Sequence, residues 1–242
     1  MQAVILAAGT GSRIREFHAL PKGFITLGDQ TLIQQSIEKL QACGVQNILI
    51  VTGYAAEFYE ALAKENKKIN TIYNAHYQNY GSLFSLYCAK DHVKEDFLIV
   101  ESDLIYEQRA IEYIVHHVQN NIILLSGATF STDEVYVQAH DLKLIRMSKN
   151  KNHLESDEIA GEFVGISKLS LRDFKQLTHQ LEQDPTLLHR GHYDEHGLVA
   201  MTAFTDVFCL KIPDLLWSEI DNRFQYERAK IIYEKMKAME VV

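Results

Sequence analysis

Two short segments near the start of the sequence carry residue types that bind phosphate groups. An apolar run ends in Gly9-Thr10-Gly11-Ser12-Arg13, and Pro21-Lys22 follows in the same predicted loop. Glycines allow the backbone to approach a phosphate closely, and Arg13 and Lys22 add positive charge. We therefore predict a loop that holds a triphosphate.

The spacing excludes two other phosphate-binding loops. The dinucleotide fingerprint requires a third glycine where Ile14 stands, and an acidic residue after the second strand, where Thr52-Gly53-Tyr54 stands. A Walker loop requires Ser or Thr after Gly-Lys, whereas Gly23 follows Lys22. A lone Gly-x-Gly is better interpreted as a simple turn, but the whole string with Pro21-Lys22 favours a functional loop.

Two aspartates are candidate ligands of Mg²⁺. Asp103 follows a predicted buried strand, at the sheet edge where ligands usually bind. Asp221 precedes the last predicted helix, and taken alone it is better interpreted as a helix cap. Mg²⁺ takes one or two carboxylates together with substrate phosphates, so a distant pair is chemically sensible. Lys149, after a predicted hairpin, is either a third functional cation or part of a solvated turn.

Histidines and cysteines give no metal or disulfide prediction. His189, His192 and His196 lie close together but match no zinc template, so we expect them to belong to local structure. The 3 cysteines form no CxxC pair and no even set, which favours a reducing compartment.

The elements that must position these residues alternate between strand and helix in the first half of the chain. Strands are predicted at Gln2–Ala8, Asn47–Val51, Ile69–Tyr73, Phe97–Val100 and Ile122–Leu125, and the first and fourth of these are expected to be buried. Helices are predicted between them at Thr31–Cys43, Tyr54–Ala63, Ser82–Lys90 and Glu107–Gln119. This order predicts an α/β fold with a mixed, mostly parallel central sheet and helices on both faces.

The second half of the chain has a different pattern. Two short strands, Glu134–Gln138 and Leu142–Met147, predict a small antiparallel excursion. The remaining predicted elements are a strand at Phe163–Leu169, helices at Leu171–Leu181 and Glu195–Ala203, an edge strand at Asp206–Leu210 and a closing helix from Phe224 to the end. Because no linker or repeat interrupts the pattern, we expect residues 1–242 to form a single domain.

Composition limits the classes of partner. The 242 residues carry a formal net charge of −8 with 47% hydrophobic residues, which argues against a protein that coats nucleic acid or an anionic membrane. The first apolar run is too short for a signal peptide or a membrane span. We therefore expect a soluble, cytoplasmic protein without membrane insertion.

The segment Leu6–Arg13 with Pro21-Lys22 resembles the signature of the sugar-phosphate and alcohol-phosphate nucleotidyltransferases, which have a Rossmann-like fold. Later motifs, in order along the chain, are similar to those of the 2-aminoethylphosphonate cytidylyltransferases. They include Asn79-Tyr80-Gly81-Ser82, Glu101-Ser102-Asp103, Asp133-Glu134-Val135-Tyr136, Ser148-Lys149-Asn150, Gly161-Glu162-Phe163, Glu195-His196 and Glu219-Ile220-Asp221-Asn222.

The resemblance implies a transfer of CMP from CTP to 2-aminoethylphosphonate, with release of pyrophosphate, in phosphonolipid or phosphonoglycan biosynthesis. It implies contacts to the nucleotide from Leu6, Ala8, Gly9, Thr52 and Ser82 and to the triphosphate from Gly11, Arg13 and Lys22. By the same resemblance, Mg²⁺ is held by Asp103 and Asp221, Lys149 neutralises a phosphonate or phosphate group, and the acceptor pocket is lined by Tyr136, Glu162 and Glu195. The resemblance is compatible with a homodimer.

Two alternatives remain at this point. Phosphocholine is the nearest rival acceptor, since Tyr106, Tyr136, Tyr193 and Trp217 could supply an aromatic cage for its quaternary ammonium. A nucleotide sensor without catalytic activity is the second alternative. A sensor is expected to lack Lys22, Asp103 or Asp221, and all three are present.

Overall fold

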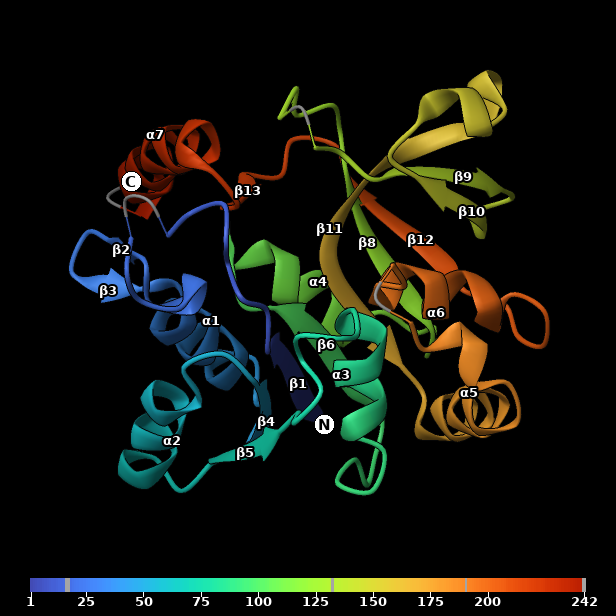
Figure 1. Ribbon diagram of the computed structural model, residues 1–242. Coiled ribbons are helices and arrows are strands. Elements are labelled where there is room, and N and C mark those ends of the chain that lie inside the picture. Colours follow the sequence, from blue (N-terminus) through green and yellow to red (C-terminus); the bar gives the residue numbers. More distant parts are fainter. Residues whose placement is uncertain (16–17, 132, 190, 241–242) are drawn as a thin grey trace.

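Nine strands in the described part of the chain form one mixed sheet (Figure 1). The computed structural model describes residues 1–15, 18–131, 133–189 and 191–240. In spatial order the strands are β5 (Ile69–Tyr73), β4 (Asn47–Thr52), β1 (Gln2–Ala7), β6 (Phe97–Glu101), β11 (Ile159–Leu169), β8 (Ile122–Ser126), β12 (Phe208–Ile212), β10 (Lys143–Ser148) and β9 (Tyr136–His140).

Strand β1 is the centre of the parallel half of this sheet. It pairs in parallel with β4 and β6, and β5 extends β4 in the same direction. All its residues are buried, with Ala3 and Ile5 in one apolar cluster and Val4 and Leu6 in the other. This burial on both faces explains the continuous apolar run in the sequence. Because the strands are parallel, the segments that follow β1, β4 and β6 meet at one edge of the sheet.

The other half of the sheet is largely antiparallel. Strand β11 runs antiparallel to both β6 and β8, and β9 pairs with β10 and also with β11. The antiparallel share is therefore larger than predicted, because the long strand β11 reverses the direction at the middle of the sheet. The prediction of an edge strand at Asp206–Leu210 is wrong, since β12 pairs in parallel with β8 and also contacts β10. The β9–β10 hairpin covers the side of β12 that the sequence pattern left open.

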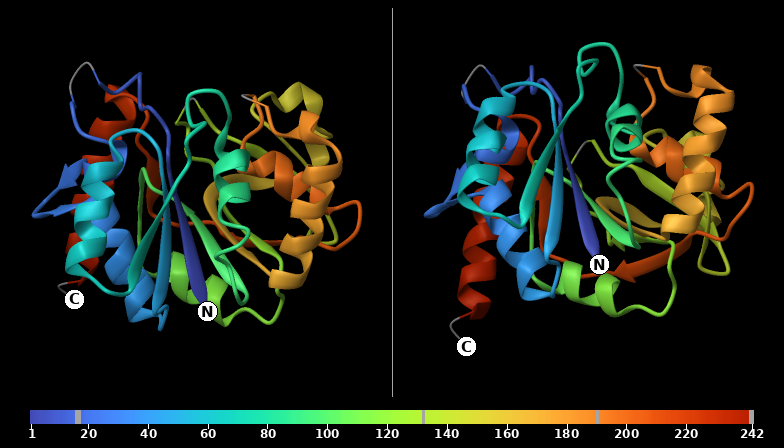
Figure 2. Two further views of the ribbon diagram at one scale, coloured as in Figure 1. Left: turned by 60° about the horizontal axis from the view of Figure 1, so that its bottom comes forward. Right: turned by 90° about the horizontal axis from the view of Figure 1, so that it is seen from below.

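Helices cover both faces of the sheet, as Figure 2 shows. One apolar cluster is completed by α1 (Leu32–Ala42), α2 (Ala56–Glu65) and α4 (Arg109–His116). The other is completed by α3 (Ser82–Cys88), α5 (Leu171–Gln183) and α6 (Asp194–Met201). Thr31 caps α1 by accepting a hydrogen bond from the backbone of Gln34, which explains where this helix begins. None of the helices in the described residues has the length and apolar character needed to cross a membrane.

A small layer beside the parallel strands was not predicted and brings two distant acidic segments together. Strand β7 (Leu104–Tyr106) pairs antiparallel with β13 (Trp217–Glu219), and the backbone N–H of Ile220 donates to the carbonyl of Asp103 at 3.0 Å. Helix α7 (Arg223–Glu240) packs on β13 and on the short hairpin of β2 (Thr26–Leu27) and β3 (Gln30–Thr31). The pairing of β7 with β13 places Asp221 beside Asp103. Residues 241–242 of the predicted closing helix lie outside the described residues.

The close approach of β11 to β8 gives a test of the sheet. A Cβ added at Gly161 meets the backbone oxygen of Ser126 at 2.5 Å, whereas a Cβ at Gly9 meets nothing within 4 Å. We expect Gly161→Ala to lower the free energy of unfolding by about 1–3 kcal/mol, because the two strands must move apart. Gly9→Ala is the matched control and is expected to change it by less than about 0.5 kcal/mol. Urea unfolding measures both, and equal stability of the two variants would contradict the strand contact.

Candidate active site

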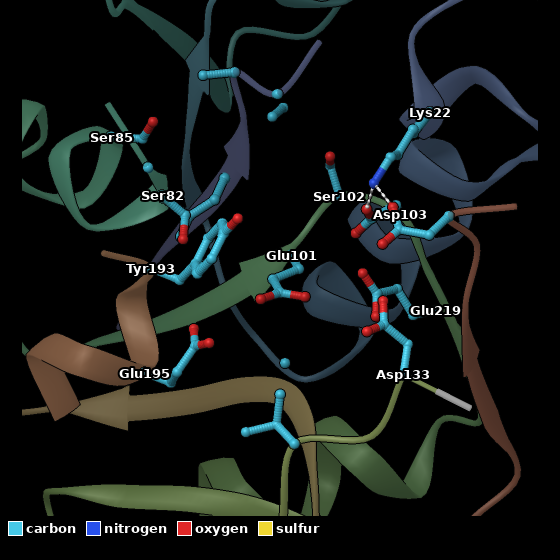
Figure 3. A pocket seen from close by; sticks show the side chains of 18 of the residues that line it. Lys22, Ser82, Ser85, Glu101, Ser102, Asp103, Asp133, Tyr193, Glu195 and Glu219 are labelled. Atoms are coloured by element: carbon cyan, nitrogen blue, oxygen red, sulfur yellow. Dashed lines mark hydrogen bonds and ion pairs between the residues drawn. The ribbon is translucent and has the colours of Figure 1, made fainter. Parts of the chain in front are cut away.

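The shared edge of the parallel strands opens into a cavity of about 340 Å³ (Figure 3). Its walls come from the loop after β1, the residues after β6, the N-terminus of α3, the loop before β9 and strand β13. This is the edge where open α/β sheets bind ligands. The residues predicted from sequence that line it are Leu6, Ala8, Gly9, Arg13, Lys22, Ser82, Asp103, Lys149, Glu195 and Asp221.

Lys22 connects the two predicted metal ligands. It begins a short 3-10 helix, η1 (Lys22–Phe24), and its Nζ donates to Asp103 Oδ2 at 2.7 Å (dashed in Figure 3) and to Asp221 Oδ1. Burial lowers the pKa of Lys22, but the two aspartates outweigh this effect and raise it above its usual value. For Asp221, burial acts to raise the pKa, but contact with Lys22 lowers it overall. Both groups therefore remain charged at neutral pH.

A second set of ion pairs joins the first loop to the antiparallel half of the molecule. Arg13 binds Asp221 and also Asp133, whose Oδ2 lies 3.3 Å from Nη1, and Lys149 Nζ lies 2.7 Å from Asp133 Oδ1. Burial acts to lower the pKa of Lys149, and Asp133 raises it overall. Asp133 is thus the shared partner of two cations that were predicted to bind phosphate groups. No local sequence pattern predicts this role of Asp133.

Four predicted residues lie outside the cavity lining, and two of them, Gly11 and Thr52, were predicted to contact the nucleotide or its triphosphate. Gly11 has a φ of +59°, and a Cβ there would lie 3.3 Å from Lys22 Cγ, so this glycine allows Lys22 to pack against the loop. Thr52 is fully buried at the end of β4, where its hydroxyl donates to the carbonyl of Ile72 at 3.4 Å. Gly11 thus permits the packing of Lys22, whereas Thr52 links β4 to β5.

The other two, Tyr136 and Glu162, were predicted to line the acceptor pocket. Glu162 accepts hydrogen bonds from the backbone N–H and the hydroxyl of Thr129, at 2.9 and 2.6 Å. Lys151 Nζ lies 4.2 Å from the centre of the Tyr136 ring. In this structure both side chains therefore hold neighbouring segments of the antiparallel half together, next to the cavity rather than at its surface.

Two glutamates that the sequence analysis did not single out face the cavity. Carboxylate oxygens of Glu101, Asp103 and Glu219 lie within 4.8 Å of one another, as do those of Asp133, Glu219 and Asp221. Burial, followed by repulsion from neighbouring carboxyl groups, raises the pKa of Glu101 and of Glu219 well above the usual value. Such a concentration of carboxyl oxygens is suited to a divalent cation or another positively charged group.

The opposite wall of the cavity is formed by the start of α6. Asp194 accepts a hydrogen bond from the Ser82 hydroxyl at 2.6 Å, which ties α6 to the N-terminus of α3. Glu195 follows and points into the cavity together with Glu101 (Figure 3). Burial and the neighbouring Asp194 raise the pKa of Glu195 to about 8. The cavity therefore has acidic groups on this side, in addition to the ion pairs around Lys22.

The three histidines form a stack before and within α6. The ring centres of His189 and His192 are 3.7 Å apart, and those of His192 and His196 are 4.9 Å apart. His196 Nδ1 accepts from the backbone N–H of Tyr193 at 3.2 Å, which completes a cap of the helix. The two groups of carboxylates suited to a metal among the described residues lie elsewhere.

Glu219 and Asp133 had weak signals in the sequence. Each lies in a motif that carried the resemblance, Glu219 two residues before Asp221 and Asp133 three before Tyr136. Their roles depend on side chains from distant segments, which no local spacing reveals.

Comparison with known proteins identifies a family model and related enzymes. The model of the MobA-like NTP transferase domain matches residues 3–187. A choline-phosphate cytidylyltransferase of Streptococcus pneumoniae is 32% identical over 108 residues, which are 44% of this chain and 47% of that enzyme. The match to this relative thus spans less than half of its length. A CTP:phosphoglutamine cytidylyltransferase of Campylobacter jejuni is 23% identical over 240 residues, 93% of this chain and 94% of that enzyme.

The fold has close counterparts among solved structures. The inositol-1-phosphate CTP transferase from T. maritima superposes with a TM-score of 0.82 and 17% sequence identity, over 98% of this chain and 96% of that one. This likeness confirms the predicted Rossmann-like nucleotidyltransferase fold.

The shared carboxylate of Asp133 leads to a test of the ion-pair chain. We expect Asp133→Asn to bind inorganic triphosphate up to about fivefold more tightly in the presence of EDTA, because Arg13 and Lys149 lose a competing anion. The gain is limited because partly exposed ion pairs contribute at most about 1 kcal/mol. Isothermal titration calorimetry measures the affinity, and the exposed Asp157→Asn is the control. Weaker binding by Asp133→Asn would contradict this competition.

Proposed function

The chain belongs to the MobA-like NTP transferase family, and on this premise we propose that it transfers CMP from CTP to 2-aminoethylphosphonate. The products are CMP-2-aminoethylphosphonate and pyrophosphate, and the proposed role is in phosphonate biosynthesis. The proposal combines three elements: a cytidine nucleotide, an acceptor with a phosphorus oxyanion, and an ammonium group on that acceptor.

The relatives support the choice of CTP. Each of the three compared proteins is named as a cytidylyl or CTP transferase that acts on a phosphorylated small molecule. The cavity supports a triphosphate, since Arg13, Lys22 and the glycine loop lie together on one side of it. These cations provide a local positive charge, which a chain with a net charge of −8 lacks overall.

The single observation that carries the choice of acceptor is the acidic wall across the cavity. Glu101 and Glu195 face the space beyond the loop cations, and both are partly buried beside other carboxyl groups. An ammonium group placed there would offset the repulsion among these acids. The phosphonate of the same small molecule can then reach Lys149 and the α-phosphorus of the nucleotide.

The reaction requires alignment and charge neutralisation. A phosphonate oxygen forms a bond to the α-phosphorus of CTP while the bond to the bridging oxygen of the β-phosphate breaks, and that oxygen leaves with pyrophosphate. A phosphonate is already ionised at neutral pH, so no side chain needs to remove a proton. Arg13, Lys22 and Lys149 instead hold two anions near one another, which is a contribution of position and electrostatics.

Mg²⁺ fits the carboxylates of this cavity. Asp103 and Asp221 belong to two groups of neighbouring carboxylates, and Glu219 belongs to both groups. These side chains offer the oxygen ligands that this ion prefers. Asp103 and Asp221 are the residues that we propose hold it. When bound, the ion would neutralise charge on the phosphate groups of the nucleotide. Lys22, which pairs with both aspartates in this structure, can then turn to the triphosphate.

The rival acceptor, phosphocholine, has weaker support from the cavity. Of the four aromatic residues that the sequence suggested for a cage, Tyr193 and Trp217 line the cavity. Tyr106 is buried at the β7–β13 pairing, and Tyr136 lies outside the lining. A quaternary ammonium requires aromatic faces, whereas a primary ammonium is satisfied by carboxylates. The acidic wall therefore favours the primary amine.

An assay of pyrophosphate release tests the proposal. With CTP and Mg²⁺, we expect release with 2-aminoethylphosphonate, slower release with phosphocholine, and only background without an acceptor. Faster release with phosphocholine would reassign the acceptor and keep the cytidylyl transfer. CTP binding without release for any acceptor would favour the nucleotide sensor instead.

The raised pKa of Glu195 predicts how acceptor binding depends on pH. Glu195, with a pKa of about 8, is mostly neutral at pH 7 and mostly anionic at pH 9. The anion attracts the ammonium group, so we expect the KM for 2-aminoethylphosphonate to fall by about tenfold between these values. Steady-state kinetics at each pH measures this fall.

The control for this prediction is Glu195→Gln, which cannot ionise. We expect its KM to be high at both pH values, with the KM for CTP close to that of the wild-type enzyme. A wild-type KM that does not change with pH, or the same slope in the variant, would rule out Glu195 as the group that binds the ammonium.

A further inference from the structure

Arg228 is a cation of the cavity that no prediction or comparison assigns. It lies on α7, which packs on β13, and it lines the cavity with Trp217 and Glu219 of that strand. Its side chain is half-buried. The sequence of this segment predicts an ordinary helix, so no local pattern indicates a functional role for Arg228.

The contacts of Arg228 differ from those of the other cavity cations. Lys22 pairs with Asp103 and Asp221, whereas Arg13 and Lys149 share Asp133. For Arg228, the structure gives a hydrogen bond from Nη1 to the Ser218 hydroxyl at 2.9 Å and, among the described residues, no ion pair. Glu134 and Glu162 influence it only as nearby charges.

A half-buried guanidinium without an ion pair is unfavourable for the free protein. Removing a charge from water costs free energy that only a counter-ion or hydrogen bonds recover, and one neutral hydroxyl recovers little of it. Ser218 occupies one N–H group, and Arg carries five donors in a planar fork. The fork matches the oxygens of a phosphoryl or phosphonate group, to which it can donate two hydrogen bonds.

We propose that Arg228 binds a phosphorus oxyanion of a substrate in this cavity and is a specificity-determining residue for the reaction. This inference rests on the proposed function for the nature of its ligands, the acceptor phosphonate or the phosphates of CTP. The observations favour the acceptor. Arg13 and Lys22 already serve the triphosphate side, and Arg228 enters from α7 and β13 rather than from the β1 loop and α3.

The position of Arg228 gives it a role that Lys149 alone cannot fill. Lys149 is tied to Asp133 and carries a single point charge, so it neutralises an anion without fixing its rotation. A planar fork held by Ser218 fixes the orientation of the bound group. With the ammonium at Glu101 and Glu195, two ends of a zwitterionic acceptor are then recognised by opposite charges across one cavity.

Binding of small anions tests the proposal without requiring turnover. The probes are ethylphosphonate, which has the phosphonate of the proposed acceptor without its amine, and pyrophosphate, which represents the nucleotide phosphates. Calorimetry compares the wild-type protein with Arg228→Gln, Arg228→Lys and the control Arg223→Gln. Arg223 is exposed at the start of the same helix and does not line the cavity, so its replacement removes the same charge without touching the site.

We expect Arg228→Gln to weaken the binding of ethylphosphonate by about tenfold or more, as for the loss of charged hydrogen bonds. Arg228→Lys should recover part of the affinity, and Arg223→Gln should match the wild type. Weakened binding of pyrophosphate alone would also support an oxyanion site and would assign it to the nucleotide. Wild-type affinity of Arg228→Gln for both probes, or no binding of either probe by the wild-type protein, would overturn the proposal.

Kinetics then separates this inference from the proposed function. With whichever acceptor supports pyrophosphate release, Arg228→Gln should raise the KM for the acceptor by about tenfold and leave the KM for CTP near the wild-type value. A protein inactive with 2-aminoethylphosphonate that still loses ethylphosphonate affinity on Arg228→Gln would overturn the acceptor identity and keep the role of Arg228. A fall in kcat with both KM values unchanged would contradict a binding role.

Discussion

The ion pairs of Lys22 with Asp103 and Asp221 are the interaction on which the site depends. They join three segments that are far apart in the chain: the first loop, the residues after β6, and the turn between β13 and α7. A largely buried ammonium requires its counter-ions, so displacement of any one segment would break at least one of these ion pairs. The hydrogen bond between the Ile220 N–H and the Asp103 carbonyl fixes the same junction through the backbone.

The other charged side chains of the cavity are connected to these ion pairs. Cations suited to phosphate and carboxylates suited to a metal neutralise one another in the chain from Lys149 to Asp103. On the proposed function, a nucleotide bound with Mg²⁺ would exchange partners with these groups: its phosphates would pair with the cations and the metal ion with the carboxylates, without creating isolated charges. Such an exchange would allow an acidic protein to hold a highly charged ligand, because existing charges are re-paired.

The sequence predicts the parallel half of the fold better than the antiparallel half, for a physical reason. Strand β1 and the glycine loop are local features, since the apolar run is buried on both faces and Gly11 is needed at a positive φ. The position of β12 depends instead on pairing with the distant β9–β10 hairpin. The same limit applies to the site: Lys22 belongs to a recognisable loop, whereas Asp133 and Glu219 gain their roles only from long-range contacts.

Acceptor recognition is the part of the site where local patterns give least information. Tyr136 and Glu162 lie in motifs that suggest the acceptor pocket, yet their side chains contact Lys151 and Thr129 and stabilise the adjacent strands. The groups that face the cavity there come from β6, α6 and α7, as Glu101, Glu195 and Arg228. Elements from three parts of the fold thus determine the charge pattern on this side of the cavity. On the proposed function, replacing a few side chains on these elements would change the acceptor, while the Lys22 junction would stay unchanged.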